Sequence, residues 1–99
     1  MPAAYRVTDM TGGHPHCYPP TPAQMGSPTV YTNSLMQMRV GDPCIVHGAC
    51  CNPCPPHPPM MAKGSGTVYV NGMPACRIGD ATNCGDKAAA GSPTVFIGG

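Results

Sequence analysis

Apolar and polar residues alternate over short stretches of the chain, and turn residues separate these stretches. Residues 67–70 read Thr-Val-Tyr-Val, a run of β-branched and aromatic side chains that is typical of a β-strand. They are followed by Asn71-Gly72, the dipeptide preferred in a type I′ hairpin turn, and by residues 75–78, Ala-Cys-Arg-Ile, as the return strand. This pattern predicts a β-hairpin.

The same pattern recurs along the sequence. Residues 26–42 read GSPTVYTNSLMQMRVGD and residues 64–80 read GSGTVYVNGMPACRIGD. A further copy is divided between the chain ends, with GSPTVFIGG at residues 91–99 and PAAYRVTD at residues 2–9. Because the two halves complete one repeat when joined, we expect adjacent termini and three similar hairpins around a pseudo-threefold axis.

Alternation also separates the side chains of the strands into two faces. We expect the valines of the repeats to face inward, with half-burial of both faces as the alternative in so small a body. The valines are Val30, Val68 and Val95, and the residues on the other face are Tyr31, Tyr69 and Phe96.

Composition limits what can hold these hairpins together. The chain has 99 residues, 9% of them charged, with 14 Pro and 13 Gly, and Leu, Ile, Val and Phe make up only about an eighth of it. A formal net charge of +1 is too low for disorder by self-repulsion. We therefore expect residues 1–99 to form one small domain that is held by something besides a large apolar core.

The composition also excludes several classes of protein. Five Lys and Arg among four acids form no basic stripe, so we expect no nucleic-acid partner. The sequence has no run of about 20 apolar residues, which a membrane span needs. Residues 1–10 lack the pattern of a Sec-type signal peptide, so we expect any export to depend on another route.

Every histidine lies in the linkers between the hairpins, residues 10–25, 43–63 and 81–90, and the last linker has a Cys instead. A threefold arrangement would bring the linkers to one end, where imidazole nitrogens and a thiolate can hold zinc tetrahedrally. Prolines limit the entropy that the linkers lose when they converge. The candidate ligands are His14, His16, His47, His57 and Cys84.

The seven cysteines cannot all pair within one chain, and without a secretory signal we expect no disulfide framework. Cys51 and Cys54 form a C-x-x-C pair that stays open as a metal or redox site of its own. A zinc site that uses Cys44 or Cys54 in place of a His also stays open. Small buried residues or free thiols are expected at Cys17, Cys44, Cys50 and Cys76.

The recurring GSPTVY-x-N and R-x-G-D motifs, the ending GSPTVFIGG and the N-terminal Pro-Ala-Ala resemble the PAAR-repeat family over essentially the whole chain. The likeness is to its short single-domain members, at the spike tip of contractile phage tails and type VI secretion systems. It implies a mostly β, small conical fold of three pseudo-threefold hairpin repeats, with zinc at the vertex. It also implies a flat base that sits on a trimeric β-helical spike protein, a phage tail spike or a VgrG-like protein.

The resemblance implies a zinc site of three His and one Cys. Carried over to this chain, the ligands are one of His14 and His16, together with His47, His57 and Cys84. His57 and Cys84 each stand seven residues before the glycine that opens the next hairpin. Iron is the alternative metal.

We therefore expect a non-enzymatic tip protein, one monomer that caps a spike trimer and meets the target envelope only transiently. Four protein ligands leave no open coordination position, so the zinc is expected to be structural. The expected location is a virion tail tip, or the bacterial cytoplasm before delivery by the contractile machine. The competing hypothesis is a small zinc-dependent hydrolase, or a redox protein that uses Cys51 and Cys54.

Overall fold

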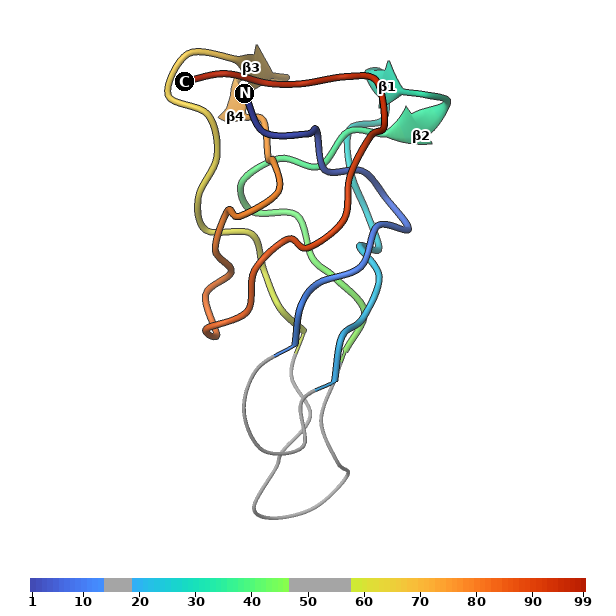
Figure 1. The fold of residues 1–99 in the computed structure, drawn as a ribbon, viewed down its shortest axis with the longest axis vertical. Helices are drawn as coiled ribbons and strands as arrows, with labels where there is room; N and C mark the ends of the chain where they lie inside the picture. Colours follow the sequence, from blue (N-terminus) through green and yellow to red (C-terminus); the bar gives the residue numbers. More distant parts are fainter. Residues whose placement is uncertain (14–18, 47–57) are drawn as a thin grey trace.

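The computed structural model describes residues 1–13, 19–46 and 58–99, and residues 14–18 and 47–57 lie outside the described part (Figure 1). Antiparallel hairpins are formed by β1 (Tyr31–Thr32) with β2 (Leu35–Met36) and by β3 (Tyr69–Val70) with β4 (Met73–Pro74). Isolated β-bridges join much of the remaining described chain, in which no helix occurs. The expected mostly β class is therefore confirmed for these residues. Within the same three segments, nothing helical is long and apolar enough to cross a membrane.

The hairpin turns have the backbone that their sequence predicts. Asn71 and Gly72 have φ angles of 53° and 79°, and Asn33 and Ser34 have φ angles of 54° and 68°. Positive φ at both central positions is the property of a type I′ turn, which Asn and Gly adopt most easily. Ser34 adopts it without the freedom of a glycine, so this turn carries more backbone strain than its counterpart.

The strands are shorter than the sequence predicted, and the return strand is Met73–Pro74 and not residues 75–78. The ladder of β3 and β4 continues by one bond, from Ala75 N to Val68 O at 3.0 Å, and then ends. It ends because Ala75 and Arg77 turn away to form bridges with Arg39 and Ala4, in the other repeats. Pairing between repeats thus replaces pairing within the hairpin.

A ring of backbone hydrogen bonds closes the centre of the molecule. Tyr5 N donates to Cys76 O, Met38 N donates to Tyr5 O, and Cys76 N donates to Met38 O, each at 3.0 Å. All three residues are fully buried. Because each repeat donates to one neighbour and accepts from the other, none of the three segments can leave without opening the ring.

Gln37 places a polar group at the same centre. Its Nε2 lies 3.1 Å from each of the carbonyl oxygens of Tyr5, Met38 and Cys76, and its Oε1 accepts from Thr32 Oγ1 at 2.7 Å. These contacts satisfy a side chain that is 1% exposed.

We call residues of different repeats corresponding when they make the same backbone bond. The glycine of each Gly-Ser motif approaches a carbonyl so closely that an added Cβ would lie within 2.8 Å of it. The next serine donates its backbone N–H to that same oxygen. Close approach therefore requires glycine at these corresponding positions. The contacts join Gly26 and Ser27 to Gln37 O, Gly64 and Ser65 to Ala75 O, and Gly91 and Ser92 to Ala4 O.

The main core lies around and beyond the ring. Buried Tyr5, Met38 and Cys76 pack with four residues of the linkers between the repeats, namely Ala23, Cys44, Met61 and Ala88. A second cluster consists of Ala4, Val70, Ala75 and Ile97. Apart from Tyr5, the main cluster uses Ala, Cys and Met, and the second cluster adds only Val70 and Ile97 to two alanines. The fold therefore needs few large apolar residues.

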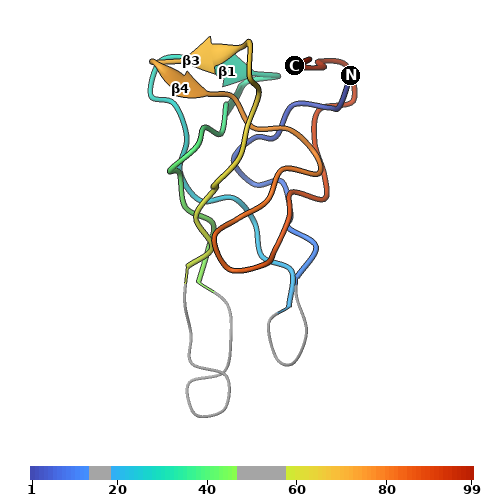
Figure 2. The ribbon, with the colours of Figure 1, turned by 90° about the vertical axis from the view of Figure 1, so that its left-hand side faces the viewer.

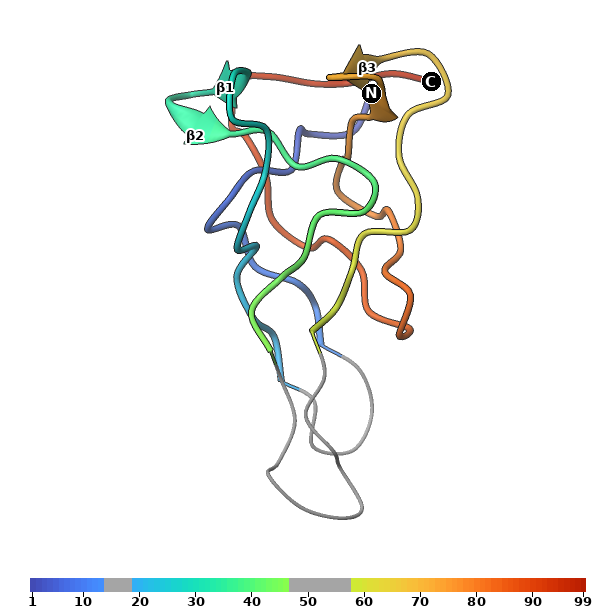
Figure 3. The same cartoon turned by 180° about the vertical axis from the view of Figure 1, so that it is seen from behind.

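The two chain ends lie side by side at the end of the molecule that carries the hairpins (Figures 1 and 3). Ala3 forms an antiparallel bridge with Phe96, and Ile97 N donates to Pro2 O at 2.9 Å. The predicted adjacency of the termini is therefore confirmed. We call β1–β4 with residues 1–3 and 95–99 the hairpin end.

The prediction that the valines of the repeats face inward is wrong, because all three are exposed. Val30, Val68 and Val95 remain 37–39% exposed, less than Tyr31, Tyr69 and Phe96 at 51–58%. The buried residues on the valine face lie two positions further along, at Thr32, Val70 and Ile97. Burial on this face thus begins only two positions after the valines, and the alternative of two half-buried faces does not describe the exposed valines either.

Candidate functional site

The candidate metal ligands divide between described and undescribed residues. Cys84 is described, whereas His14, His16, His47 and His57 lie outside the described part. In the residues with assigned positions, no group of three or more His, Cys, Asp and Glu is arranged to hold a metal. The structure therefore informs the proposed metal site only through Cys84 and through the segments next to the histidines.

Three backbone bonds define the base of the linkers. Thr11 N donates to Thr21 O at 2.8 Å, Cys44 N donates to Pro59 O at 2.7 Å, and Thr82 N donates to Asp86 O at 2.9 Å. The segments that carry these bonds lie opposite the hairpin end (Figures 1 and 2). We call residues 10–13, 19–22, 43–46, 58–60 and 81–87 the loop end.

These bonds align the candidate ligands by sequence count. His14 is three residues after Thr11, and His47 is three residues after Cys44. His57 is two residues before Pro59, and Cys84 is two residues before Asp86. By the same count, no histidine of the second linker corresponds to His16.

Cys84 stands in the short turn between Thr82 and Asp86. Its side chain is half-buried, and its Sγ lies 3.3 Å from Thr82 Oγ1. The same Oγ1 accepts the backbone N–H of Asp86 at 3.1 Å and lies 3.2 Å from Asp86 O, which can take its proton. The turn is thus organised around one buried hydroxyl.

The other described cysteines belong to the core. Cys44 and Cys76 are fully buried free thiols, as expected of small buried residues. Burial raises the pKa of both thiols, and Cys44 Sγ lies 3.4 Å from the Tyr5 hydroxyl. This burial disfavours the thiolate that a metal would need at Cys44. The other cysteines, Cys17, Cys50, Cys51 and Cys54, lie outside the described part.

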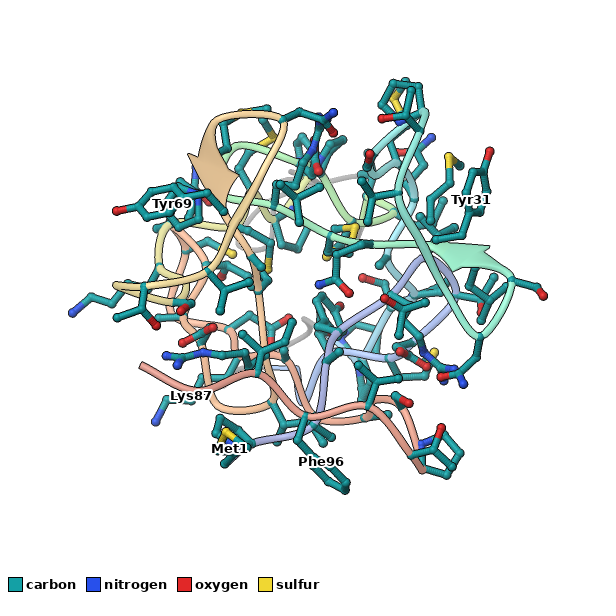
Figure 4. The ribbon with its side chains drawn as sticks, turned by 90° about the horizontal axis from the view of Figure 1, so that it is seen from above. Met1, Tyr31, Tyr69, Lys87 and Phe96 are labelled. Atoms are coloured by element: carbon teal, nitrogen blue, oxygen red, sulfur yellow. The ribbon has the colours of Figure 1, made fainter. Side chains whose placement is uncertain are left out.

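The hairpin end presents a second candidate surface, of apolar side chains. Viewed from above, Tyr31, Tyr69 and Phe96 point outward around its rim, from three separate parts of the chain (Figure 4). The valine before each of them is more than a third exposed. Three similar Val-aromatic pairs therefore surround this end.

A polar network holds each pair in place. The hydroxyl of Ser27 accepts backbone N–H bonds from Thr29 and Val30 at 3.2 and 2.9 Å. Ser65 and Ser92 accept corresponding bonds from the residues two and three positions ahead. These bonds fix the backbone directly before each exposed aromatic residue, so the surface is pre-organised.

An ion pair between an arginine and an aspartate braces the chain where each repeat leads into its linker. Arg39 Nε lies 2.8 Å from Asp42 Oδ2, and Arg39 Nη2 donates to Asp42 Oδ1 at 3.0 Å. This paired bonding raises the pKa of the arginine and is the strong, bidentate form of ion pair. The other two pairs with the same geometry are Arg6–Asp9 and Arg77–Asp80.

Sequence reasoning named no residues for this second surface. The repeated R-x-G-D and R-V-T-D stretches, together with the asparagines, were a signal for it, because Arg6 and Arg39 donate to the asparagines of the two hairpin turns. Asn71 Oδ1 accepts from Arg39 Nη1 at 3.1 Å, and Asn71 Nδ2 donates to Thr29 Oγ1 at 3.0 Å. Asn71 is therefore more than a turn residue.

Recurring Gly-Ser motifs and paired Arg-Asp motifs define this chain as a small β protein built from sequence repeats. Residues 46–90 match the family model of the PAAR motif, and this match includes Cys84 and the third Arg-Asp pair. The match covers slightly less than half of the chain and supports a PAAR-repeat family protein. The comparison with curated proteins found no match to this chain.

Proposed function

We propose that this protein is a non-enzymatic structural tip protein, which binds zinc and caps the trimeric β-helical spike of a contractile tail or type VI secretion system. The observation that carries the proposal is the PAAR motif at residues 46–90, because PAAR proteins are structural tip proteins. The proposed architecture is a small cone of three pseudo-threefold repeats, in keeping with the ring of Tyr5, Met38 and Cys76. The protein would act on a virion tail tip, or be assembled in the bacterial cytoplasm and delivered outward.

The hairpin end is the proposed docking surface for the spike. Three exposed Val-aromatic pairs can each meet one subunit of a trimer, so that one chain closes the threefold end. The serine bonds hold these pairs in one conformation before binding, which reduces the entropy that association costs. Docking here would also cover the short strand edges of β1–β4.

The loop end is the proposed zinc vertex. We assign His14, His47, His57 and Cys84 as ligands, because His14 and His47 have the same offset from corresponding residues, as do His57 and Cys84. Nitrogen and sulfur donors suit zinc, with iron as the alternative. Such an ion would crosslink the three linkers of the tip, which supports a structural role during penetration of an envelope.

The docking proposal is tested with a purified trimeric β-helical spike protein of a contractile machine. We expect size-exclusion chromatography with light scattering to show one copy of this chain per trimer. Val68→Asp should abolish the complex, because it places a charge on the proposed contact surface. Lys87→Ala, a change at an exposed residue of the loop end, is the control and should leave the complex intact. Equal binding by the two variants would remove the hairpin end as the docking surface.

A further inference from the structure

The hydroxyl of Thr82 stands between two possible acceptors. Thr82 Oγ1 lies 3.3 Å from Cys84 Sγ and 3.2 Å from Asp86 O, and the Thr82 side chain is buried. Its lone pairs face the backbone N–H of Asp86 at 3.1 Å and of Cys84 at 3.4 Å. The oxygen is thus held in place from both sides of the turn.

A threonine hydroxyl has one proton, so it can donate to only one of the two acceptors at a time. A neutral thiol is a weak acceptor, and the carbonyl of Asp86 then takes the proton. A thiolate is charged, and hydrogen bonds to a charged acceptor are roughly twice as strong as neutral ones. Because Thr82 Oγ1 lies only 3.3 Å from Cys84 Sγ, rotation of the hydroxyl alone would direct its hydrogen to a sulfur that holds a metal.

We infer that Thr82 is a positioning residue for the Cys84 thiolate, a role that rests on the proposed zinc site. In the metal-bound protein, Thr82 Oγ1 donates its proton to Cys84 Sγ and so orients the sulfur at the loop end. Partners of metal ligands act in this way, by fixing the ligand and by tuning how much charge it gives the metal. The bond involves no change of covalent structure, only rotation of one hydroxyl.

The fold supplies a matched control in Thr11, which corresponds to Thr82. Thr11 Oγ1 accepts the backbone N–H of Thr21 at 3.0 Å, as Thr82 Oγ1 accepts that of Asp86. Thr11 is also buried, at 2% exposure. Replacing Thr11 by Val therefore removes the same backbone bond without touching Cys84.

The test uses the full-length protein loaded with zinc or with Co²⁺, whose sulfur-to-metal charge-transfer band reports on the thiolate. We expect Thr82→Val to lower zinc affinity on the order of 10-fold in a chelator competition. We also expect its charge-transfer band to move to lower energy, because the sulfur loses a donor and becomes more electron-rich. Thr82→Ser should restore both values, and Thr11→Val should leave both at the wild-type level.

Two results would overturn the inference, and they differ in what they say of the zinc site. If Cys84→Ala keeps the wild-type zinc content and cobalt spectrum, Cys84 is no ligand and the proposed site falls with the role of Thr82. If Cys84→Ala loses the band but Thr82→Val matches Thr11→Val in affinity and spectrum, the zinc site stands and Thr82 is only structural. Thermal unfolding of each apo variant separates loss of fold from loss of metal.

Discussion

The side-chain oxygen of Asn71 and the main-chain oxygen of Gly98 serve as the same acceptor in different parts of the hairpin end. Asn71 Oδ1 accepts from Arg39 Nη1 at 3.1 Å and from Ser27 Oγ. Gly98 O accepts from Arg77 Nη1 at 3.1 Å and from Ser65 Oγ at 2.6 Å. A hairpin turn and a chain terminus thus tie an arginine and a serine together in the same way.

This relationship predicts that Asn71→Ala destabilises the protein by about 2 kcal/mol, because an arginine donor and a serine hydroxyl lose their shared acceptor. Asn71→Asp keeps an oxygen at that place and should cost less. Urea unfolding of the two variants is the measurement. A cost for Asn71→Ala that is no larger than that for Asn71→Asp would mean that the acceptor contributes little.

Thr8 is predicted to carry backbone strain. Its φ of 81° is in the left-handed region, where the corresponding residues are Gly41 and Gly79, with φ of 96° and 91°. A β-branched residue is disfavoured there, so Thr8→Gly should raise the free energy of unfolding by about 1 kcal/mol. Gly41→Thr is the reciprocal control. It should lower stability for conformational reasons alone, since an added Cβ at Gly41 would meet no atom within 4 Å. Thermal or urea unfolding that ranks the two changes in the opposite order would contradict this account.

The polar contact between Thr32 and Gln37 predicts strong coupling. Each single change, Thr32→Val or Gln37→Ala, leaves a buried polar group without its partner and should cost about 2 kcal/mol. The double variant places Val and Ala where the corresponding residues are Val70 and Ala75, and it should cost clearly less than the sum of the singles. A double-mutant cycle by urea unfolding measures the coupling, and additive costs would show that the two side chains act independently.

Stability is predicted to fall at alkaline pH. Burial raises the pKa of the Cys44 and Cys76 thiols in the folded chain above that of unfolded cysteine, about 8.5. Above that pH the unfolded chain binds fewer protons than the folded one, so stability is complete below it and declines as pH rises. A thiol that stays protonated in the folded chain while unfolded cysteine is ionised contributes a slope of at most about 1.4 kcal/mol per pH unit. Cys44→Ser and Cys76→Ser should each flatten the decline between pH 8 and pH 10, measured by urea unfolding; slopes equal to the wild type would contradict the assignment.

The proposed zinc site predicts different outcomes for neighbouring histidines. His14→Ala, His57→Ala and Cys84→Ala should each lose metal and several kcal/mol of stability, whereas His16→Ala should keep both. Elemental analysis and thermal unfolding with and without a strong chelator are the measurements. If His16→Ala loses the metal and His14→Ala retains it, the alignment of His14 with His47 is the wrong guide to the first ligand.

Two of the three predicted hairpins and the meeting of the termini could be predicted from the sequence because they depend on local chemistry. The repeat that is divided between the chain ends forms an isolated bridge, Ala3 with Phe96, and no paired strands. Asn71 and Gly72 favour positive φ wherever they occur, and the Gly-Ser motifs repeat in the printed order of residues. The class of the protein followed from the same motifs. The zinc site is a different case, because it was inferred only from the linkers in which the histidines occur. The histidines themselves lie outside the described part, so the structure shows only the segments next to them.

Long-range packing decided the rest. Strands that alternation extends to residues 75–78 end early because Ala75 and Arg77 pair with other repeats, a choice that no local pattern contains. The valines are more exposed than expected, and burial on their face begins two positions later, at Thr32, Val70 and Ile97. The contact of Thr82 with Cys84 also needs a folded turn, since only a closed backbone brings a hydroxyl and a sulfur to 3.3 Å. Local preference could thus be predicted from the residues, whereas contacts between distant segments depend on how three repeats share one small core.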